Sequence, residues 1–144
     1  MQIHSLAADT FGKEQVEEFW RIVASINWPE NQNALNIRAD LLEQLSPRAA
    51  KITREICDFY MRALVQRLND WRKATNDTKE LSMLSVELAA SNAVGGGQQN
   101  YDEYLKNPGF LTFEVNDVDT WDHFSYCIPA EDDYFVSNEI SDLF

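Results

Sequence analysis

The sequence predicts an α+β fold in which a body of four to five helices precedes a small C-terminal strand element. Two observations lead to this prediction. Over most of the first 106 residues, apolar side chains recur at three- and four-residue spacing, as on the buried face of an amphipathic helix. After residue 109 the chain carries short runs of aromatic and β-branched residues, which strands favour. A wholly α-helical fold is the alternative.

Length and composition indicate one domain spanning residues 1–144, with enough apolar residues to form a core. No stretch approaches the roughly 20 apolar residues that span a bilayer, and the N-terminus lacks the basic and apolar regions of a secretory signal. Cys57 and Cys127 form no motif, so we expect two buried thiols in a reducing compartment. A cytoplasmic protein is the simplest expectation.

The first predicted helix covers residues 13–27, with Thr10 as its N-cap and Pro29 as its stop. Its apolar stripe is Val16, Phe19, Trp20, Val23 and Ile26. A second helix is predicted over 33–45, with the stripe Leu35, Leu41, Leu42 and Leu45.

Ser46-Pro47 marks the start of a long third helix, predicted over 47–74. Serine is a preferred N-cap, and proline at the first helical position loses no hydrogen bond. The predicted buried face is Ala49, Ile52, Ile56, Phe59, Tyr60, Ala63, Leu64 and Leu68. Its basic residues alternate with acids, which predicts a nearly neutral polar face.

A fourth helix is predicted over 78–94, with Leu81, Leu84, Leu88 and Ala89 facing inward, and Gly95-Gly96-Gly97 is expected to end it. A short fifth helix over 99–106 would carry Tyr101, Tyr104 and Leu105. The glycine run lacks the Lys-Ser/Thr or the glycine spacing of a phosphate-binding loop, so we interpret it as a turn.

Strands are predicted at 110–115, 124–128 and 134–136, where aromatic and branched residues gather. The alternative for this region is a pair of short helices over 118–126 and 131–143, because the acids at 131–133 suit a helix N-terminus.

The net charge of −12 is concentrated at the C-terminal end of the chain. Residues 1–100 hold 11 Lys/Arg and 13 Asp/Glu, whereas residues 101–144 hold one Lys and 11 Asp/Glu. A field of this sign repels nucleic acids and anionic membranes and attracts cationic partners. The acidity therefore excludes direct nucleic-acid binding, and it is also compatible with a role in solubility alone.

The acidic C-terminal third also contains 10 of the 17 aromatic residues. Protein interfaces combine aromatic anchors with a charged rim that steers the partner. We therefore predict that this region binds a basic protein, through Glu114, Asp117, Asp119, Trp121, Asp122, Glu131, Asp132, Asp133 and Tyr134. The alternative is that its aromatics are core residues and its acids only solvate it.

Two other chemistries are less well supported by the sequence. Asp117, Asp119, Asp122 and His123 are the densest group of metal-ligand types, but they match neither the calcium-loop nor the zinc spacing. A Cys127–His123 nucleophile pair lacks any sign of activation, and His4 lies near a terminus that we expect to fray. We expect no metal, no cofactor and no enzymatic activity.

Several short motifs carry a family resemblance. They are Phe19-Trp20, Leu41-Leu42 with Leu45-Ser46-Pro47, Phe59, the glycines at 95–97 followed by Tyr101 and Tyr104, and Phe124-Ser125-Tyr126. Together they resemble an uncharacterised bacterial family of small acidic domains of unknown function. In size and charge the chain is also similar to the immunity proteins of bacterial toxin systems. That resemblance implies an inhibitor that occludes the active site of a basic toxin. The alternatives are a phage-type inhibitor that mimics nucleic acid, and a metal-binding protein or enzyme.

Overall fold

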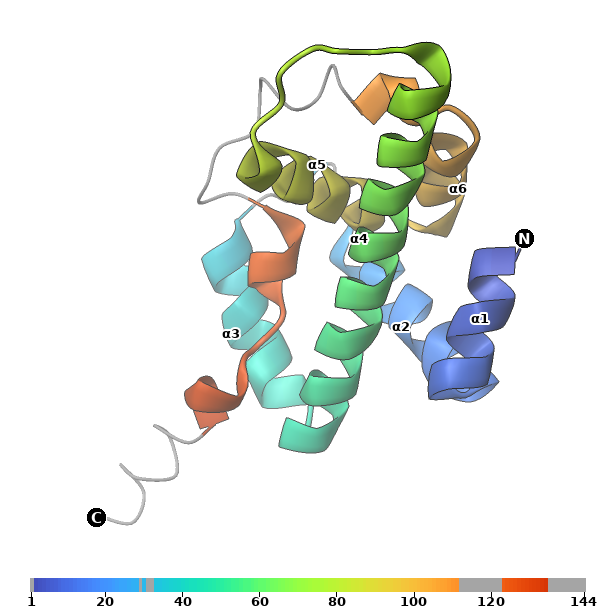
Figure 1. Cartoon of the computed structure of the whole chain (residues 1–144). Helices are drawn as coiled ribbons and strands as arrows, with labels where there is room; N and C mark the ends of the chain where they lie inside the picture. Colours follow the sequence, from blue (N-terminus) through green and yellow to red (C-terminus); the bar gives the residue numbers. More distant parts are fainter. Residues whose placement is uncertain (1, 29, 31–32, 112–122, 135–144) are drawn as a thin grey trace.

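The structure is a computed structural model, and it describes residues 2–28, 30, 33–111 and 123–134. Within these ranges six α-helices have both ends described, and residues 131–134 add a helical turn (Figure 1). The six α-helices are α1 Gln2–Phe11, α2 Lys13–Ile26, α3 Ala34–Gln44, α4 Pro47–Thr75, α5 Met83–Gly95 and α6 Gln98–Lys106, followed by the 3₁₀ helices η1 Pro108–Phe110 and η3 Phe124–Cys127.

The predicted α+β class is wrong, because the described residues form helices and no strand. Phe110 and Leu111, at the start of the strand expected over 110–115, are helical, and the strand expected at 124–128 is η3. Tyr134 is also helical, and the other residues of the predicted strands lie outside the described ranges. The wholly helical alternative fits the described structure.

The strand predicted over 124–128 is wrong because the buried residues of this segment do not alternate as they would in a strand. Phe124, Cys127 and Ile128 are the buried ones, at helix-like spacing. The N–H groups of Phe124 and Ser125 donate to side chains of α5, Asn92 Oδ1 at 2.9 Å and Ser91 Oγ at 2.7 Å. The hydrogen bonds that a sheet would satisfy are thus satisfied by helix side chains.

The long helix α4 begins as the sequence predicts. The Ser46 hydroxyl accepts a hydrogen bond from the Ala49 N–H at 3.1 Å, and Pro47 occupies the first turn. Of its predicted face, Ile56, Tyr60, Leu64 and Leu68 are fully buried. These residues and the five predicted apolar positions of α2 belong to one hydrophobic core.

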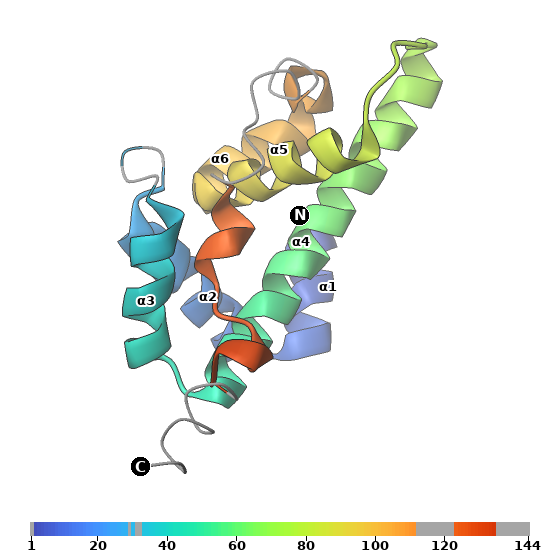
Figure 2. The same ribbon diagram turned by 90° about the vertical axis from the view of Figure 1, so that its left-hand side faces the viewer.

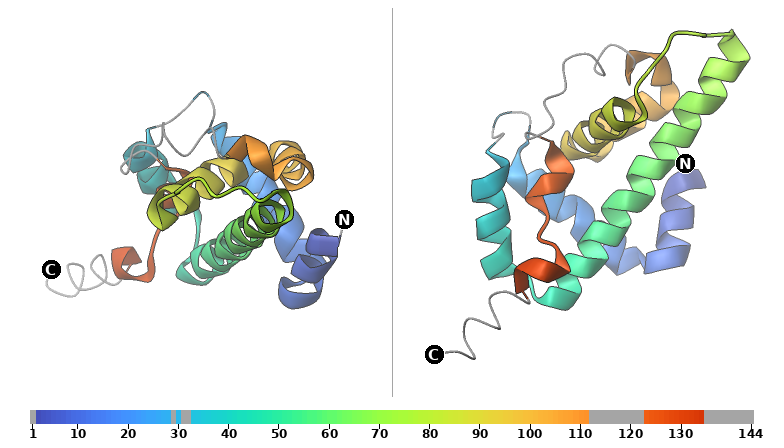
Figure 3. Two further views of the ribbon diagram at one scale, coloured as in Figure 1. Left: turned by 45° about the horizontal axis from the view of Figure 1, so that its top comes forward. Right: turned by 60° about the vertical axis from the view of Figure 1, so that its left-hand side comes forward.

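The other elements lie beside and behind α4 in the view of Figure 1, and Figure 2 shows the same arrangement from the side. Helix α5 crosses α4, with α6 beside α5, as the turned views of Figure 3 also show. Helices α1 and α2 contact α4 through their own buried residues. The segment 123–134 runs between α3 and α4, so it is enclosed by elements far away in the sequence (Figure 2).

Helix α1 was not predicted, and the expectation that His4 lies in a frayed terminus is wrong. Ile3, Ala7 and Phe11 recur at four-residue spacing and pack on the core, a pattern that would have revealed the helix. Thr10 is not an N-cap, since its hydroxyl donates to the Leu6 carbonyl within α1. The cap position of α2 is Gly12, which adopts a positive φ of 94°.

Two leucines and one helix start also differ from the prediction. Leu35 is 65% exposed and Leu84 is 56% exposed, whereas Leu88 and Ala89 are buried as expected. Helix α5 begins at Met83 rather than 78, capped by the Ser82 hydroxyl. The glycine run ends α5 as expected, and Gly97 then takes a φ of 101° at the start of α6.

Candidate protein-interaction surface

The predicted partner-binding residues divide into two groups. One group lies outside the described residues: Glu114, Asp117, Asp119, Trp121 and Asp122. The other group, Glu131, Asp132, Asp133 and Tyr134, forms a short helical turn at the end of the segment that runs between α3 and α4.

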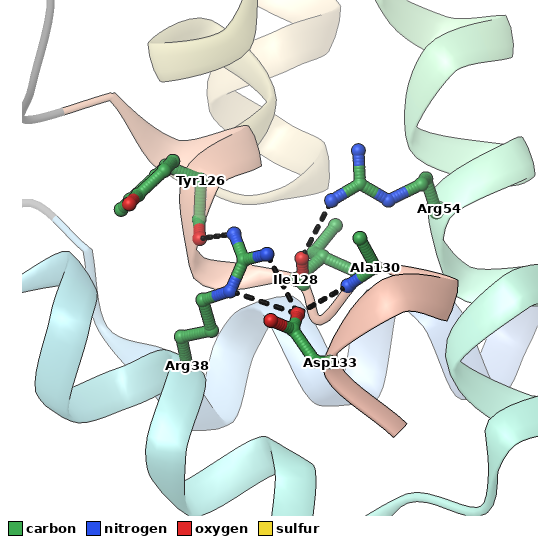
Figure 4. Close-up of polar contacts among 6 residues, drawn as sticks. All are labelled: Arg38, Arg54, Tyr126, Ile128, Ala130 and Asp133. Carbon is green, nitrogen blue, oxygen red and sulfur yellow. Dashed lines mark hydrogen bonds and ion pairs between the residues drawn. The ribbon is translucent and has the colours of Figure 1, made fainter. Parts of the chain in front are cut away.

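Asp133 is held by an arginine of α3 (Figure 4). Arg38 donates to Asp133 Oδ2 from Nη2 at 2.6 Å and from Nε at 3.1 Å. Its Nη1 donates to the Tyr126 carbonyl at 3.1 Å, and its guanidinium carbon lies 4.9 Å from the centre of the Tyr126 ring. The same carboxylate oxygen accepts the Ala130 N–H at 2.7 Å, as in a capping box. Asp133 therefore serves an internal contact.

Two further hydrogen bonds fasten this segment. Arg54 of α4 donates from Nη2 to the Ile128 carbonyl at 2.8 Å (Figure 4), and the Tyr134 hydroxyl donates to the Leu45 carbonyl at 2.9 Å. Charged donors make the stronger hydrogen bonds in proteins. Asp133 and Tyr134 thus hold the turn in place, while the side chains of Glu131 and Asp132 project into solvent.

The Cys127–His123 pair is not assembled for nucleophilic catalysis. Cys127 is fully buried, and burial raises the pKa of its thiol to about 12. His123 pairs instead with the Ser125 hydroxyl, at 2.8 Å from Nδ1, and desolvation lowers its pKa. Burial also raises the pKa of Cys57. Both thiols are free and stay protonated at neutral pH, so neither is an activated nucleophile.

A second histidine makes a polar contact that the sequence did not reveal. His4 Nε2 donates to Asp102 Oδ1 at 2.6 Å, and His4 Nδ1 lies 2.9 Å from the Tyr60 hydroxyl. Burial raises the pKa of Tyr60, so its phenol stays protonated at neutral pH. These hydrogen bonds connect α1 to α4 and α6. Because Tyr60 is fully buried, a substrate has no access to its phenol.

Four arginines make structural hydrogen bonds. Arg38, Arg54, Arg67 and Arg72 each donate to a main-chain carbonyl of their own chain. Most described acids are exposed: Asp9, Glu14, Glu17, Glu18, Glu30, Asp40, Glu43, Glu55, Asp70, Glu80, Glu87, Glu103, Glu131 and Asp132. Nine of the twelve basic residues are exposed as well, so the described surface carries an excess of acids that comes from composition rather than from burial of the bases.

The middle of α4 offers a surface of mixed character that the sequence analysis did not single out. Asp58, Arg62 and Gln66 form a ridge with a cavity on either side, of about 560 Å³ toward Phe11 and about 330 Å³ toward Glu87. The spacing of these three residues places them on one face of the helix. Acids and apolar side chains are thus also mixed outside the C-terminal region.

Within the described ranges, no group of three or more His, Cys, Asp or Glu side chains gathers in a way that could hold a metal ion. Of the predicted metal-ligand types, Asp117, Asp119 and Asp122 lie outside those ranges. None of the described helices combines the length and the apolar content that crossing a membrane requires.

Comparison with protein-family models, with curated proteins and with solved structures gives no match. The resemblances to an uncharacterised acidic family and to immunity proteins therefore stay predictions.

Proposed function

We propose that the protein is a binding inhibitor of a basic protein partner, of the kind that immunity proteins of bacterial toxin systems represent. The observation that carries this proposal is the excess of acids on the surface. Among the described residues 14 exposed acids outnumber nine exposed basic residues, on a chain of net charge −12. A surface of this kind speeds the encounter with a cationic partner.

The segment 123–134 supports a recognition role because it is held rigidly. Arg38 and Arg54 fix its main chain, so Glu131 and Asp132 are presented from a fixed turn rather than from a loose end. A preorganised surface loses less conformational entropy on binding. In the proposed complex these acids meet lysines or arginines of the partner that would otherwise hold a phosphate group, which blocks the partner's active site.

We place the protein in the cytoplasm. Cys57 and Cys127 are both buried and free, a state that a reducing compartment maintains.

The test is affinity capture from a lysate of the organism that makes the protein, with wild type and two charge-reversed variants. Glu131→Lys/Asp132→Lys changes the proposed surface. Glu14→Lys/Glu17→Lys is the matched control, since it reverses two exposed acids near the α1–α2 end of the molecule. We expect a basic protein to be captured by wild type and control but not by the first variant.

The captured protein is then purified and its activity measured with increasing amounts of inhibitor. We expect stoichiometric loss of that activity. A partner that keeps full activity in the complex would contradict inhibition, and equal capture by all three baits would contradict the proposed surface. Displacement of the inhibitor by duplex DNA would instead indicate the nucleic-acid-mimic alternative.

A further inference from the structure

A cavity of about 550 Å³ lies at the C-terminal end of α4, away from the surface discussed above. It forms where α4, the connection to α5 and the turn after α6 meet, at the top of Figure 1. Small-molecule sites generally measure about 300–1,000 Å³. The cavity is therefore large enough for a ring system with one substituent.

Two aromatic rings line this cavity. Trp71 of α4 is half-buried, and Phe110 of η1 is 58% exposed. The backbone of Gly109 lies against the indole, because a Cβ atom there would come within 2.7 Å of Trp71 Cζ2. The turn can therefore sit on Trp71 only without a side chain at 109. Phe110, which the core does not cover, stands at the cavity beside it.

The charged groups of the cavity are mainly positive. Lys79 and Lys106 line it together with a single acid, Asp77. Asp77 is already engaged, since its carboxylate lies 3.9 Å from Arg72 Nε and accepts the Lys79 N–H at 3.0 Å. Within the described part of the chain, the ion pair of Lys106 is with Glu103, at 3.8 Å, and both side chains are more than 60% exposed. Exposed pairs of this kind contribute little, so both ammonium groups remain able to bind an anion.

We infer that this cavity binds a planar aromatic anion. The ring of the ligand lies against Trp71 and Phe110, and its carboxylate or phosphate accepts hydrogen bonds from Lys79 and Lys106. The lysines and the aromatic side chains are needed together. Exposed lysines bind simple anions weakly in water, and a ligand ring without a charge gains only stacking on Trp71 and Phe110. The inference does not depend on the proposed inhibitor function, which uses other residues.

The experiment measures binding of four probes to the full chain by NMR, followed through the indole N–H signal of Trp71. Adenosine monophosphate and indole-3-acetate present a ring with a phosphate or a carboxylate. Adenosine and inorganic phosphate present the ring and the anion separately. The variants are Lys79→Gln/Lys106→Gln and Phe110→Ala, all at exposed positions. Lys13→Gln and Leu84→Ala are the matched controls, since both are exposed and lie on other helices.

We expect at least one aromatic anion to bind, with the separate ring and the separate phosphate at least about tenfold weaker. Which anion binds distinguishes a phosphate from a carboxylate ligand. The double lysine variant and Phe110→Ala should each weaken binding about tenfold, and the controls should leave it unchanged. Thermal melts establish that each variant is folded. No binding of either aromatic anion at about 1 mM, equal binding of phosphate alone, or binding that the variants leave intact would each overturn the inference.

Discussion

At the scale of single residues, Gly95 shows how closely the C-terminal segment is packed. A Cβ atom at this position would lie 2.7 Å from the Cβ and Cγ atoms of Phe124. Phe124 is 1% exposed, and its ring also contacts Trp28 with centroids 6.0 Å apart. The first glycine of the run is thus required by packing rather than by its backbone conformation.

Gly95→Ala should lower the free energy of unfolding by about 1–3 kcal/mol, because Phe124 has no space in which to move. Urea denaturation measures this change. Gly97→Ala is the comparison, since the space around Gly97 is open and only its φ of 101° opposes a side chain. A Gly95→Ala protein as stable as wild type would show that Phe124 does not pack as described.

The two cysteines should be inert in the folded protein. Burial keeps both thiols protonated, with the pKa of Cys127 raised to about 12. Only the thiolate reacts with iodoacetamide, so neither cysteine should be labelled at neutral pH until denaturant is added. Mass spectrometry counts the labels. Rapid labelling of the native protein at either residue would contradict the burial of the thiols.

His123 should make the protein less stable in mild acid. Its pKa is lowered by desolvation, so the unfolded chain binds a proton at a higher pH than the folded one. The contribution of neutral His123 to the free energy of unfolding is therefore fully present above the pKa of the unfolded chain, about 6.5, and is lost as the pH falls below that value. Urea denaturation at about pH 7.5 and pH 5.5 should show a smaller loss for His123→Gln than for wild type. An equal loss would mean that other groups cause it.

At the scale of elements, the helices of the body were predictable because their signals are local. The cap at Ser46 and the five apolar residues of α2 determine their helices with little help from the rest of the chain. The segment 123–134 was not predictable in this way. Its conformation depends on Arg38, Arg54 and side chains of α5, which lie 32 to 95 positions away in sequence. The local sequence therefore predicted strands, whereas contacts with distant residues stabilise a helical conformation instead.

Helix α1 was missed although the four-residue spacing of Ile3, Ala7 and Phe11 indicates it; what the sequence did not show is how α1 attaches to the core. Ala7 is the one fully buried residue of α1. The polar contacts of the helix are the hydrogen bonds of His4 with Tyr60 and Asp102, which lie 56 and 98 positions away in the sequence. A lone histidine near a terminus gives no sign of such partners. The helix was therefore predictable from its own apolar spacing, whereas its polar attachment through His4 was not.

Arg38 and Asp133 should stabilise the attachment of the segment to α3 jointly. Arg38→Met and Asp133→Asn should each lower the free energy of unfolding by about 1–3 kcal/mol, because charge-assisted hydrogen bonds are lost. The double variant should lose less than the sum of the two single losses, since each side chain acts mainly through the other. Denaturation of all four proteins closes this double-mutant cycle. Additive losses would show that the pair is not coupled.

At the scale of the whole molecule, composition predicted the net charge of the protein better than it predicted which residues are available to bind a partner. The net charge of −12 follows from the sequence, but only the structure shows that Arg54 and Arg67 donate to carbonyls of their own chain. Of the predicted binding residues, Glu131 and Asp132 are exposed acids, whereas Asp133 and Tyr134 hold the turn itself. Sequence cannot separate these roles, because the partners of Asp133 and Tyr134 lie on α3 and just after it.

The most direct test of the proposed function is the salt dependence of affinity for the captured partner. It compares wild type with Glu131→Lys/Asp132→Lys, using purified proteins. Steered binding to an acidic surface predicts an affinity that falls about tenfold or more between low and high salt, and a much weaker dependence in the variant. An affinity that does not change with salt concentration, or an equal salt dependence in both proteins, would contradict recognition through these acids.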